Sequence, residues 1–188
     1  ITFCEKIKAD VRTSHIPVIL LTAKDSLQDK EEGYRSGADS YLTKPFSASL
    51  LHSRINNLLE TRKRLATQFV FDSGKDEKSA QFKESLNKLD NEFLESLTHL
   101  IEENIQSEKV DISYLSGKLF MSNSTLYRKV KALTGISTNE FVRKVKMNNA
   151  EHLLLTGKYN ISEVAFRVGM SGPVYFRQCF KEEFGLSP

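Results

Sequence analysis

The feature that most constrains the fold is a pattern that occurs twice in the second half of the chain. Residues 111–135 and residues 161–188 each predict two short helices joined by a sharp turn. The second helix of each unit carries an apolar stripe along one face. The stripe consists of Leu126, Val130 and Leu133 in the first unit and of Phe176, Phe180 and Phe184 in the second. This succession of short helices and turns predicts an all-α domain.

Local signals mark the ends of these helices. Gly169 ends the first helix of the second unit, because glycine accepts the left-handed conformation that a tight turn demands. We expect Ser171 to cap the helix that follows, and Pro173 suits a first turn whose N–H groups have no intrahelical partner. In the first unit Ser122 is the expected N-cap and Gly135 closes the helix.

Polar and basic side chains occupy the opposite face of each second helix, at the spacing of neighbours on a helix surface. We expect them to contact double-stranded DNA, as the exposed face of a recognition helix does. They are Ser124, Tyr127, Arg128 and Lys131 in the first unit and Pro173, Val174, Arg177, Gln178 and Lys181 in the second. One such helix would fit an ordinary amphipathic surface helix equally well, whereas two copies favour DNA recognition.

The segment between the two units predicts one long helix, from about Thr138 to Thr156. At 1.5 Å per residue it would be roughly 28 Å long. A rigid spacer of that length can place two recognition helices about one turn of B-DNA apart, roughly 34 Å, on the same side of the duplex.

Residues 90–188 resemble the DNA-binding domain of AraC/XylS-type transcription regulators. The resemblance is carried by "LYRKVKALTGIS", "NNAEHLLL", "ISEVAFRVGMS" and "YFRQCFKEEFGLSP". It implies two helix-turn-helix units joined by a linker helix. Met170 departs from the pattern, because the family usually has Phe there, but the exchange keeps an apolar side chain.

The first third of the chain has the pattern of an α/β fold. Residues 16–22, "IPVILLT", form a continuous apolar run that predicts a strand buried on both faces of a parallel sheet. Residues 40–45 predict a second short strand, after a polar helix that ends at Gly37. The next helix has Ser47 as its expected N-cap. Four apolar residues of this helix are expected to face the sheet: Leu51, Ile55, Leu58 and Leu59.

This order resembles the second half of a response-regulator receiver domain, which has a flavodoxin-like fold. The similar segments include "HIPVILLTA" and "GADSYLTKPF". The resemblance implies that Thr22 is the hydroxyl residue that bonds a phosphoryl group and that Lys44 is the lysine that pairs with that group. It also implies that Pro45 follows a cis peptide bond and that Tyr41 is the aromatic switch residue. A hydroxyl and an ammonium at one edge of a parallel sheet can hold a dianion.

A complete receiver also contains an aspartate that accepts the phosphoryl group and an acidic pair that binds Mg²⁺. These residues would lie before Ile1, and Asp10 and Asp25 fall in the wrong places to replace them. We therefore expect a receiver fragment that is not phosphorylated as it stands and that holds no cofactor of its own. The uncovered strand edge of such a fragment predicts that it is either unstable alone or covered by a second copy, as in a homodimer.

We divide the chain, which is mainly α, into a partial α/β receiver at residues 1–65, a linker at 66–89 and the helical domain at 90–188. The linker contains "DSGKDEKSAQ", a flexible composition. The combination resembles the output end of hybrid two-component regulators, in which a sensor kinase and the receiver share one polypeptide, often anchored in the inner membrane. The resemblance implies a sensor kinase, or a kinase domain of the same polypeptide, as a partner.

Composition and charge narrow the classes of function. The sequence has no long apolar run and no signal peptide, so we expect a cytoplasmic chain. Cys4 and Cys179 are lone, which predicts free thiols, and the histidines lack the spacing of metal ligands. From residue 110 onward, 11 Lys and Arg stand against 6 Asp and Glu, and the preceding helix is acidic. This asymmetry suits phosphate contacts.

The sequence favours a sequence-specific DNA-binding transcription regulator, the output part of a two-component phosphorelay. The alternative is a protein-interaction or dimerisation module that does not bind DNA, but Arg and Lys on both recognition faces argue against it. We do not expect an enzyme or a small-molecule substrate, because the sequence shows no nucleophile–base pair, metal cluster or phosphate-binding loop. Histidine kinase activity in a full-length hybrid would lie outside this chain.

Overall fold

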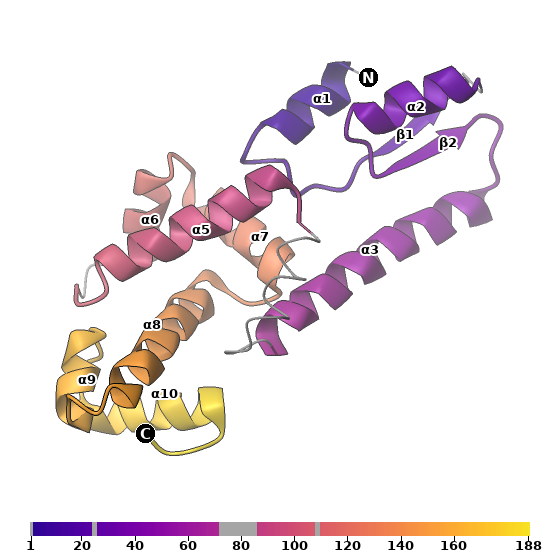
Figure 1. The fold of residues 1–188 in the computed structure, drawn as a ribbon. Coiled ribbons are helices and arrows are strands. Elements are labelled where there is room, and N and C mark those ends of the chain that lie inside the picture. The colour runs from indigo at the N-terminus through magenta and orange to yellow at the C-terminus, as the bar shows by residue number, and fades with distance from the viewer. Residues whose placement is uncertain (1, 24–25, 72–85, 108–109) are drawn as a thin grey trace.

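In a computed structural model, which describes residues 2–23, 26–71, 86–107 and 110–188, the chain forms a small α/β part and a larger helical domain (Figure 1). The α/β part consists of α1 (Thr2–Ala9), β1 (Ile19–Thr22), α2 (Leu27–Arg35), β2 (Ser40–Thr43) and α3 (Ala48–Phe71). The helical domain consists of α5 (Lys88–Glu103), α6 (Ile112–Lys118), α7 (Asn123–Thr134), α8 (Thr138–Leu155), α9 (Ile161–Arg167) and α10 (Pro173–Phe184). The expectation of a mainly α chain with a partial α/β segment is confirmed.

The two strands pair in parallel, with Ile19 opposite Ser40 and Thr22 opposite Thr43. The expectation that the first strand runs from residue 16 and is buried on both faces was wrong. Strand β1 begins only at Ile19, and Leu21 is 44% exposed. Successive side chains of a strand point to opposite faces. Helix α2 lies on the face of Leu20, where Gly33 is close to the Leu20 side chain. On the other face Leu21 is exposed, whereas its partner Leu42 in β2 is buried.

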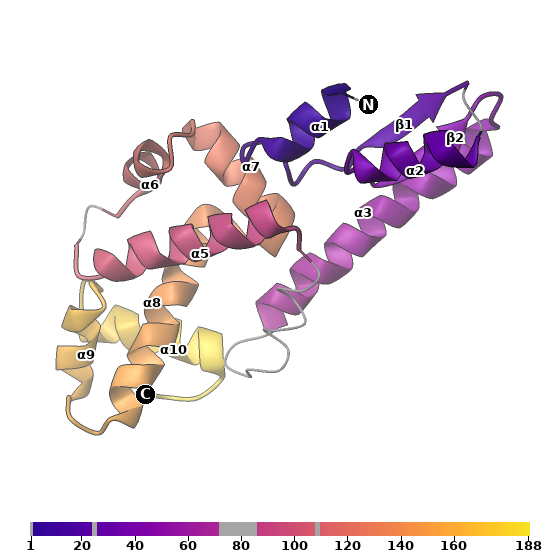
Figure 2. The same cartoon turned by 45° about the horizontal axis from the view of Figure 1, so that its top comes forward.

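Helix α3 begins as expected, since the Ser47 hydroxyl accepts a hydrogen bond from the N–H of Leu50 at 3.2 Å. Its apolar residues do not all face the sheet, which corrects the sequence-based expectation. Ile55 is 39% and Leu59 is 58% exposed, and the other two residues of that set are half-buried. The physical reason is the path of α3, which leaves the two-stranded sheet and extends toward the helical domain (Figures 1 and 2).

The far end of α3 packs against α7, where Ala66 lies beside Gly135. Helix α3 therefore continues to Phe71, into the segment 66–89 that the sequence predicts as a linker. Residues 72–85 of that segment lie outside the described residues. Helix α5 then starts at Lys88, with Asn87 as its N-cap.

The helical domain has two apolar cores, and α8 contributes to both. The first core surrounds Leu97 and Leu126, and Phe141 of α8 packs into it. The second core surrounds Phe176, and Met147 and Ala150 of α8 pack into it. Helix α8 is capped by Ser137 in a capping box and spans nearly the residues that the sequence predicts. A single continuous helix therefore joins both helix-turn-helix units.

Each unit turns at a residue in the left-handed conformation, Phe120 (φ 54°) in the first and Gly169 (φ 63°) in the second. Phe120 adopts this conformation although it is not glycine, and its side chain is 92% exposed. A Cβ atom on Gly169 would overlap the carbonyl oxygen of Ile105, so this turn requires glycine.

The expectation that Ser171 caps α10 was wrong. Gly172 occupies the cap position, and no side chain accepts a hydrogen bond from the first turn of the helix. The turn of the second unit, from Val168 to Gly172, is one residue longer than the turn of the first unit, from Leu119 to Ser122. This extra residue moves the serine out of the cap position, whereas Ser122 caps α7 as expected.

Candidate nucleic-acid interface

Helix α7 separates its buried stripe from a polar face, as the sequence predicts. Its apolar stripe is buried in the first core. The side chains on the other face are exposed: Ser124, Tyr127, Arg128 and Lys131. The Nε atom of Arg128 donates to the carbonyl oxygen of Ser124 at 3.2 Å, which lays the side chain along the helix surface. The guanidinium group can therefore reach a base edge or a phosphate from a defined position.

Helix α10 shows the same division. Phe176 and Phe180 are buried, and their ring centroids lie 5.7 Å apart. All five residues predicted to contact DNA are exposed: Pro173, Val174, Arg177, Gln178 and Lys181. Two exposed faces that carry Arg and Lys are thus held by one continuous helix, α8.

Lys129 of α7 is a residue that the sequence analysis missed. It is fully buried, forms an ion pair with Asp90 of α5 and donates to the Ser14 hydroxyl at 2.9 Å. The Ser14 hydroxyl donates in turn to Asp90 at 2.7 Å. Burial lowers the pKa of the Lys129 ammonium, and Asp90 opposes that shift. A signal was present in the sequence, because residue 129 lies between Leu126 and Leu133 on the buried side of the helix.

This cluster ties the α/β part to the first helix-turn-helix unit, because Ser14 lies in the segment between α1 and β1. His15, the next residue, is also buried, and its Nδ1 atom has no hydrogen-bond partner. Burial lowers its pKa to about 4, and the nearby charge of Lys129 acts in the same direction. Arg62 and Lys8 lower it further, whereas Asp90 opposes the shift.

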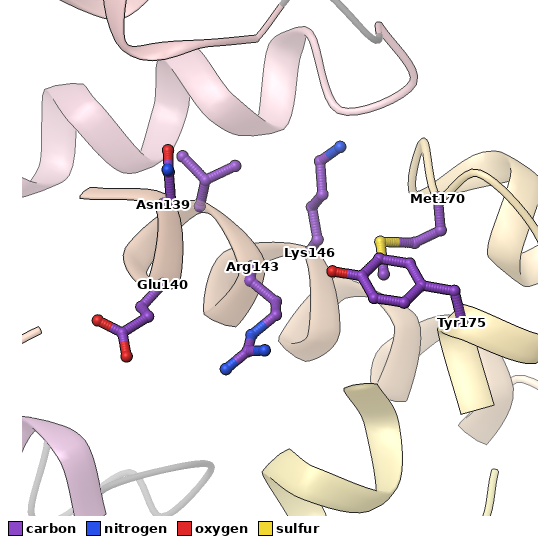
Figure 3. Close-up of a pocket in the computed structure, with 7 residues that line it drawn as sticks. Asn139, Glu140, Arg143, Lys146, Met170 and Tyr175 are labelled. Atoms are coloured by element: carbon purple, nitrogen blue, oxygen red, sulfur yellow. The ribbon is translucent and has the colours of Figure 1, made fainter. Parts of the chain in front are cut away.

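A pocket opens beside α8, the helix that joins the two helix-turn-helix units in the sequence (Figure 3). Its lining includes Asn139, Arg143 and Lys146 of α8, and Tyr175 of α10. The Nζ atom of Lys146 donates to the carbonyl oxygen of Gly169 at 2.9 Å, which ties α8 to the turn of the second unit. None of these pocket residues is predicted from the sequence to contact DNA.

Three of the four residues that the receiver resemblance singles out, Thr22, Lys44 and Pro45, lie at one end of the sheet, and the fourth, Tyr41, lies inside β2. The N–H of Lys44 donates to the carbonyl oxygen of Thr22 at 2.7 Å, and Lys44 is exposed. The Lys44–Pro45 peptide bond is cis, as the resemblance implies. Tyr41 lies against Gly33 of α2, and a Cβ atom on that glycine would overlap the ring of Tyr41.

Within the described residues, no group of three His, Cys, Asp or Glu side chains could hold a metal ion. In the same part of the chain, no helix has the length and apolar character needed to span a membrane. Cys4 and Cys179 are free thiols, as expected, and both are buried.

Comparison with known families matches this architecture. A helix-turn-helix domain model covers residues 115–188, and a response regulator receiver domain model covers residues 1–56. The first region is of the AraC type, and the second belongs to the receiver family. The chain thus joins receiver sequence to an AraC-type helix-turn-helix domain.

Two relatives match the chain over different lengths. The chain is 39% identical over 185 residues to histidine kinase P4 of Formosa agariphila. The aligned region covers 98% of this chain and 13% of that protein. The chain is also 45% identical over 64 residues to the DNA-binding dual master transcriptional regulator RpaA of Synechocystis. This aligned region covers 34% of this chain and 27% of that protein. The chain thus spans well under two thirds of the length of either relative.

A solved structure shares the helical fold. An AraC-type transcriptional regulator from Chromobacterium violaceum superposes with a TM-score of 0.50, at 22% sequence identity. The match covers 54% of this chain and 90% of that one. At this identity the likeness concerns the fold alone.

Proposed function

We propose that this chain is the DNA-binding output segment of a two-component transcription regulator and that it docks α7 and α10 on one face of the same duplex. The observation that carries the proposal is the dual role of α8. Because Phe141 packs into the first core and Met147 into the second, the two recognition faces are held in a fixed relation. A fixed pair of recognition helices reads two neighbouring segments of the major groove.

The roles of the exposed side chains follow from their chemistry. Arg128 and Gln178 can form paired hydrogen bonds with base edges, Arg with guanine and Gln with adenine. Lys131 and Lys181 carry point charges that suit phosphates. Val174 is an exposed apolar side chain that can contact a thymine methyl group. The remaining residues of the predicted set, Ser124, Tyr127, Pro173 and Arg177, complete the two contact surfaces.

The α/β part would couple the DNA-binding domain to the phosphorylation state of a receiver. We propose a receiver part at 1–65, a connection at 66–89 and the DNA-binding part at 90–188, with a sensor kinase, or a kinase domain of the same polypeptide, as the partner that phosphorylates a complete receiver. Thr22 and Lys44 supply a hydroxyl and an ammonium for a phosphoryl group. The described residues offer no carboxylate cluster for Mg²⁺, so no metal-dependent step is assigned to this chain.

A homodimer is part of this proposal, because α3 exposes Ile55 and Leu59 on its surface. A segment that binds chromosomal DNA acts on the cytoplasmic side, so a membrane anchor would belong to other parts of a full-length hybrid. Kinase activity would likewise belong to those parts.

The test is selection of bound sequences from a random duplex pool, followed by titration of the selected and a scrambled duplex. We expect the selected duplex to bind about 10³-fold or more tightly at physiological salt. Equal affinity for both duplexes would refute sequence-specific recognition. Failure to bind either duplex at low salt would favour the protein-interaction module instead.

A further inference from the structure

A line of charged and polar side chains connects the two recognition helices across α8. It starts at Lys131 of α7 and passes Glu140 and Arg143 of α8. It ends at Glu182 and Gln178 of α10. Arg143 Nη1 lies 3.3 Å from Glu182 Oε2, and Gln178 donates to the other oxygen of Glu182 at 3.1 Å. The pKa of Glu140 is lowered mainly by hydrogen bonds with Ser137, and the charges of Lys131 and Arg143 add to that shift.

Arg143 lies at the centre of this line and lines the pocket beside α8. Figure 3 shows its guanidinium group on the same side of α8 as the carboxylate of Glu140, whereas the ammonium of Lys146 points to the other side. Arg143 and its partner Glu182 remain 39% and 49% exposed. The pair is therefore open to solvent, and a competing anion can reach the guanidinium group.

A duplex that fills both recognition faces must carry its sugar–phosphate backbone across α8, because consecutive major-groove segments are separated by the backbone. A guanidinium group binds phosphate through two parallel hydrogen bonds, and an exposed Arg–Glu pair is weakly held. Phosphate can thus replace Glu182 as the partner of Arg143.

We propose that Arg143 is a phosphate-contact residue between the two recognition helices and that Glu182 holds it in place until DNA binds. This inference rests on the proposed function and adds to it a third contact, on the spacer helix itself. When Arg143 turns to the phosphate, Glu182 loses its ion pair. The carboxylate of Glu182 then lies close to the DNA backbone and opposes binding.

The experiment measures the dissociation constant of the 188-residue chain for the selected and scrambled duplexes across a salt series. Arg143→Ala should weaken binding to both duplexes by about tenfold at low salt and reduce the slope of log K against log salt by about 0.9. Arg143→Lys should keep most of the slope, because the charge remains, while it loses part of the affinity. Glu182→Gln should tighten binding to both duplexes.

The matched control is Arg35→Ala, which removes an exposed arginine from a Glu31–Arg35 pair on α2. It should leave affinity and slope unchanged. Thermal unfolding of each variant separates a folding defect from a lost contact, and Arg143→Lys preserves the test if Arg143→Ala is unstable.

An unchanged salt slope in Arg143→Ala would overturn the inference, and so would a loss confined to the selected duplex, since that would indicate a base contact. In both cases wild-type discrimination between duplexes would leave the proposed function standing. If the wild-type chain binds neither duplex, the proposed function fails and this inference fails with it.

Discussion

Replacement of Lys129 by Met tests the buried cluster that joins α5, α7 and the segment after α1. The side chain of Lys129 is fully buried, and its ammonium contacts Asp90 and the Ser14 hydroxyl and lies 4.8 Å from the centre of the Phe93 ring. Met fills a similar volume with an unbranched chain, so Lys129→Met removes the charge without opening a large cavity.

The expected cost follows from what remains around Asp90. Removal of one partner from a buried ion pair costs about 3–5 kcal/mol, because the other charge stays buried and unpaired. Asp90 still accepts from Ser14 at 2.7 Å and from Asn87 at 2.7 Å, which places the expected loss near the lower end, about 3 kcal/mol. With a denaturant slope of about 2 kcal/mol/M, the urea midpoint should fall by about 1.5 M.

Urea unfolding followed by circular dichroism measures this loss. The matched control is Lys131→Met, the same substitution two residues later on the exposed face of α7, which should change stability by less than about 0.5 kcal/mol. The double variant Lys129→Met with Asp90→Leu should recover most of the loss, because an apolar pair can replace a buried ion pair. If Lys129→Met loses no more stability than Lys131→Met, the cluster does not stabilise the fold.

Three further predictions follow from single residues. The folded-state pKa of His15 is lowered from 6.5 to about 4, so the unfolded chain takes up the proton first. The contribution of His15 to the free energy of unfolding should be fully present above pH 6.5 and should fall by about 2–3 kcal/mol as the pH drops toward 4. His15→Phe should remove this pH dependence in urea titrations at several pH values. Gly169→Ala should cost about 2–4 kcal/mol of unfolding free energy, whereas Gly157→Ala should cost about 1 kcal/mol. Gly157 also has a positive φ angle (65°), but a Cβ atom there would meet no neighbouring atom. Equal losses for the two glycines would contradict the close approach at the first. In DNA titrations Arg128→Ala should cost about 1–3 kcal/mol on the selected duplex and relax the preference at one base pair, whereas Lys131→Ala should weaken all duplexes alike; a uniform loss for Arg128→Ala would rule out base readout.

Local signals were sufficient to predict the elements of the helical domain. The apolar stripes, the cap at Ser122 and the left-handed turn at Gly169 depend on residues close in sequence, and the structure confirms each. The cap at Ser171 was predicted one residue too early, because the second turn contains one more residue than the first. Serine is a common N-cap, so residue type alone does not reveal that Gly172 takes this position.

Features that depend on distant partners could not be predicted in the same way. The pairing of Arg143 with Glu182 joins residues 39 positions apart on different helices, and no local pattern marks it. The exposure of Leu21 and Leu59 likewise depends on which elements cover the sheet and α3, whereas their apolar character suggests only that they could be buried.

The central claim is that α7 and α10 dock together on one duplex. The most direct test inserts about 5 bp between the two half-sites of the selected duplex, roughly half a helical turn, so that one half-site rotates to the far side. We expect the affinity to fall toward the non-specific level, a loss of about 10³-fold. Undiminished binding to the spaced duplex would contradict it, because only one helix-turn-helix unit would then be docked.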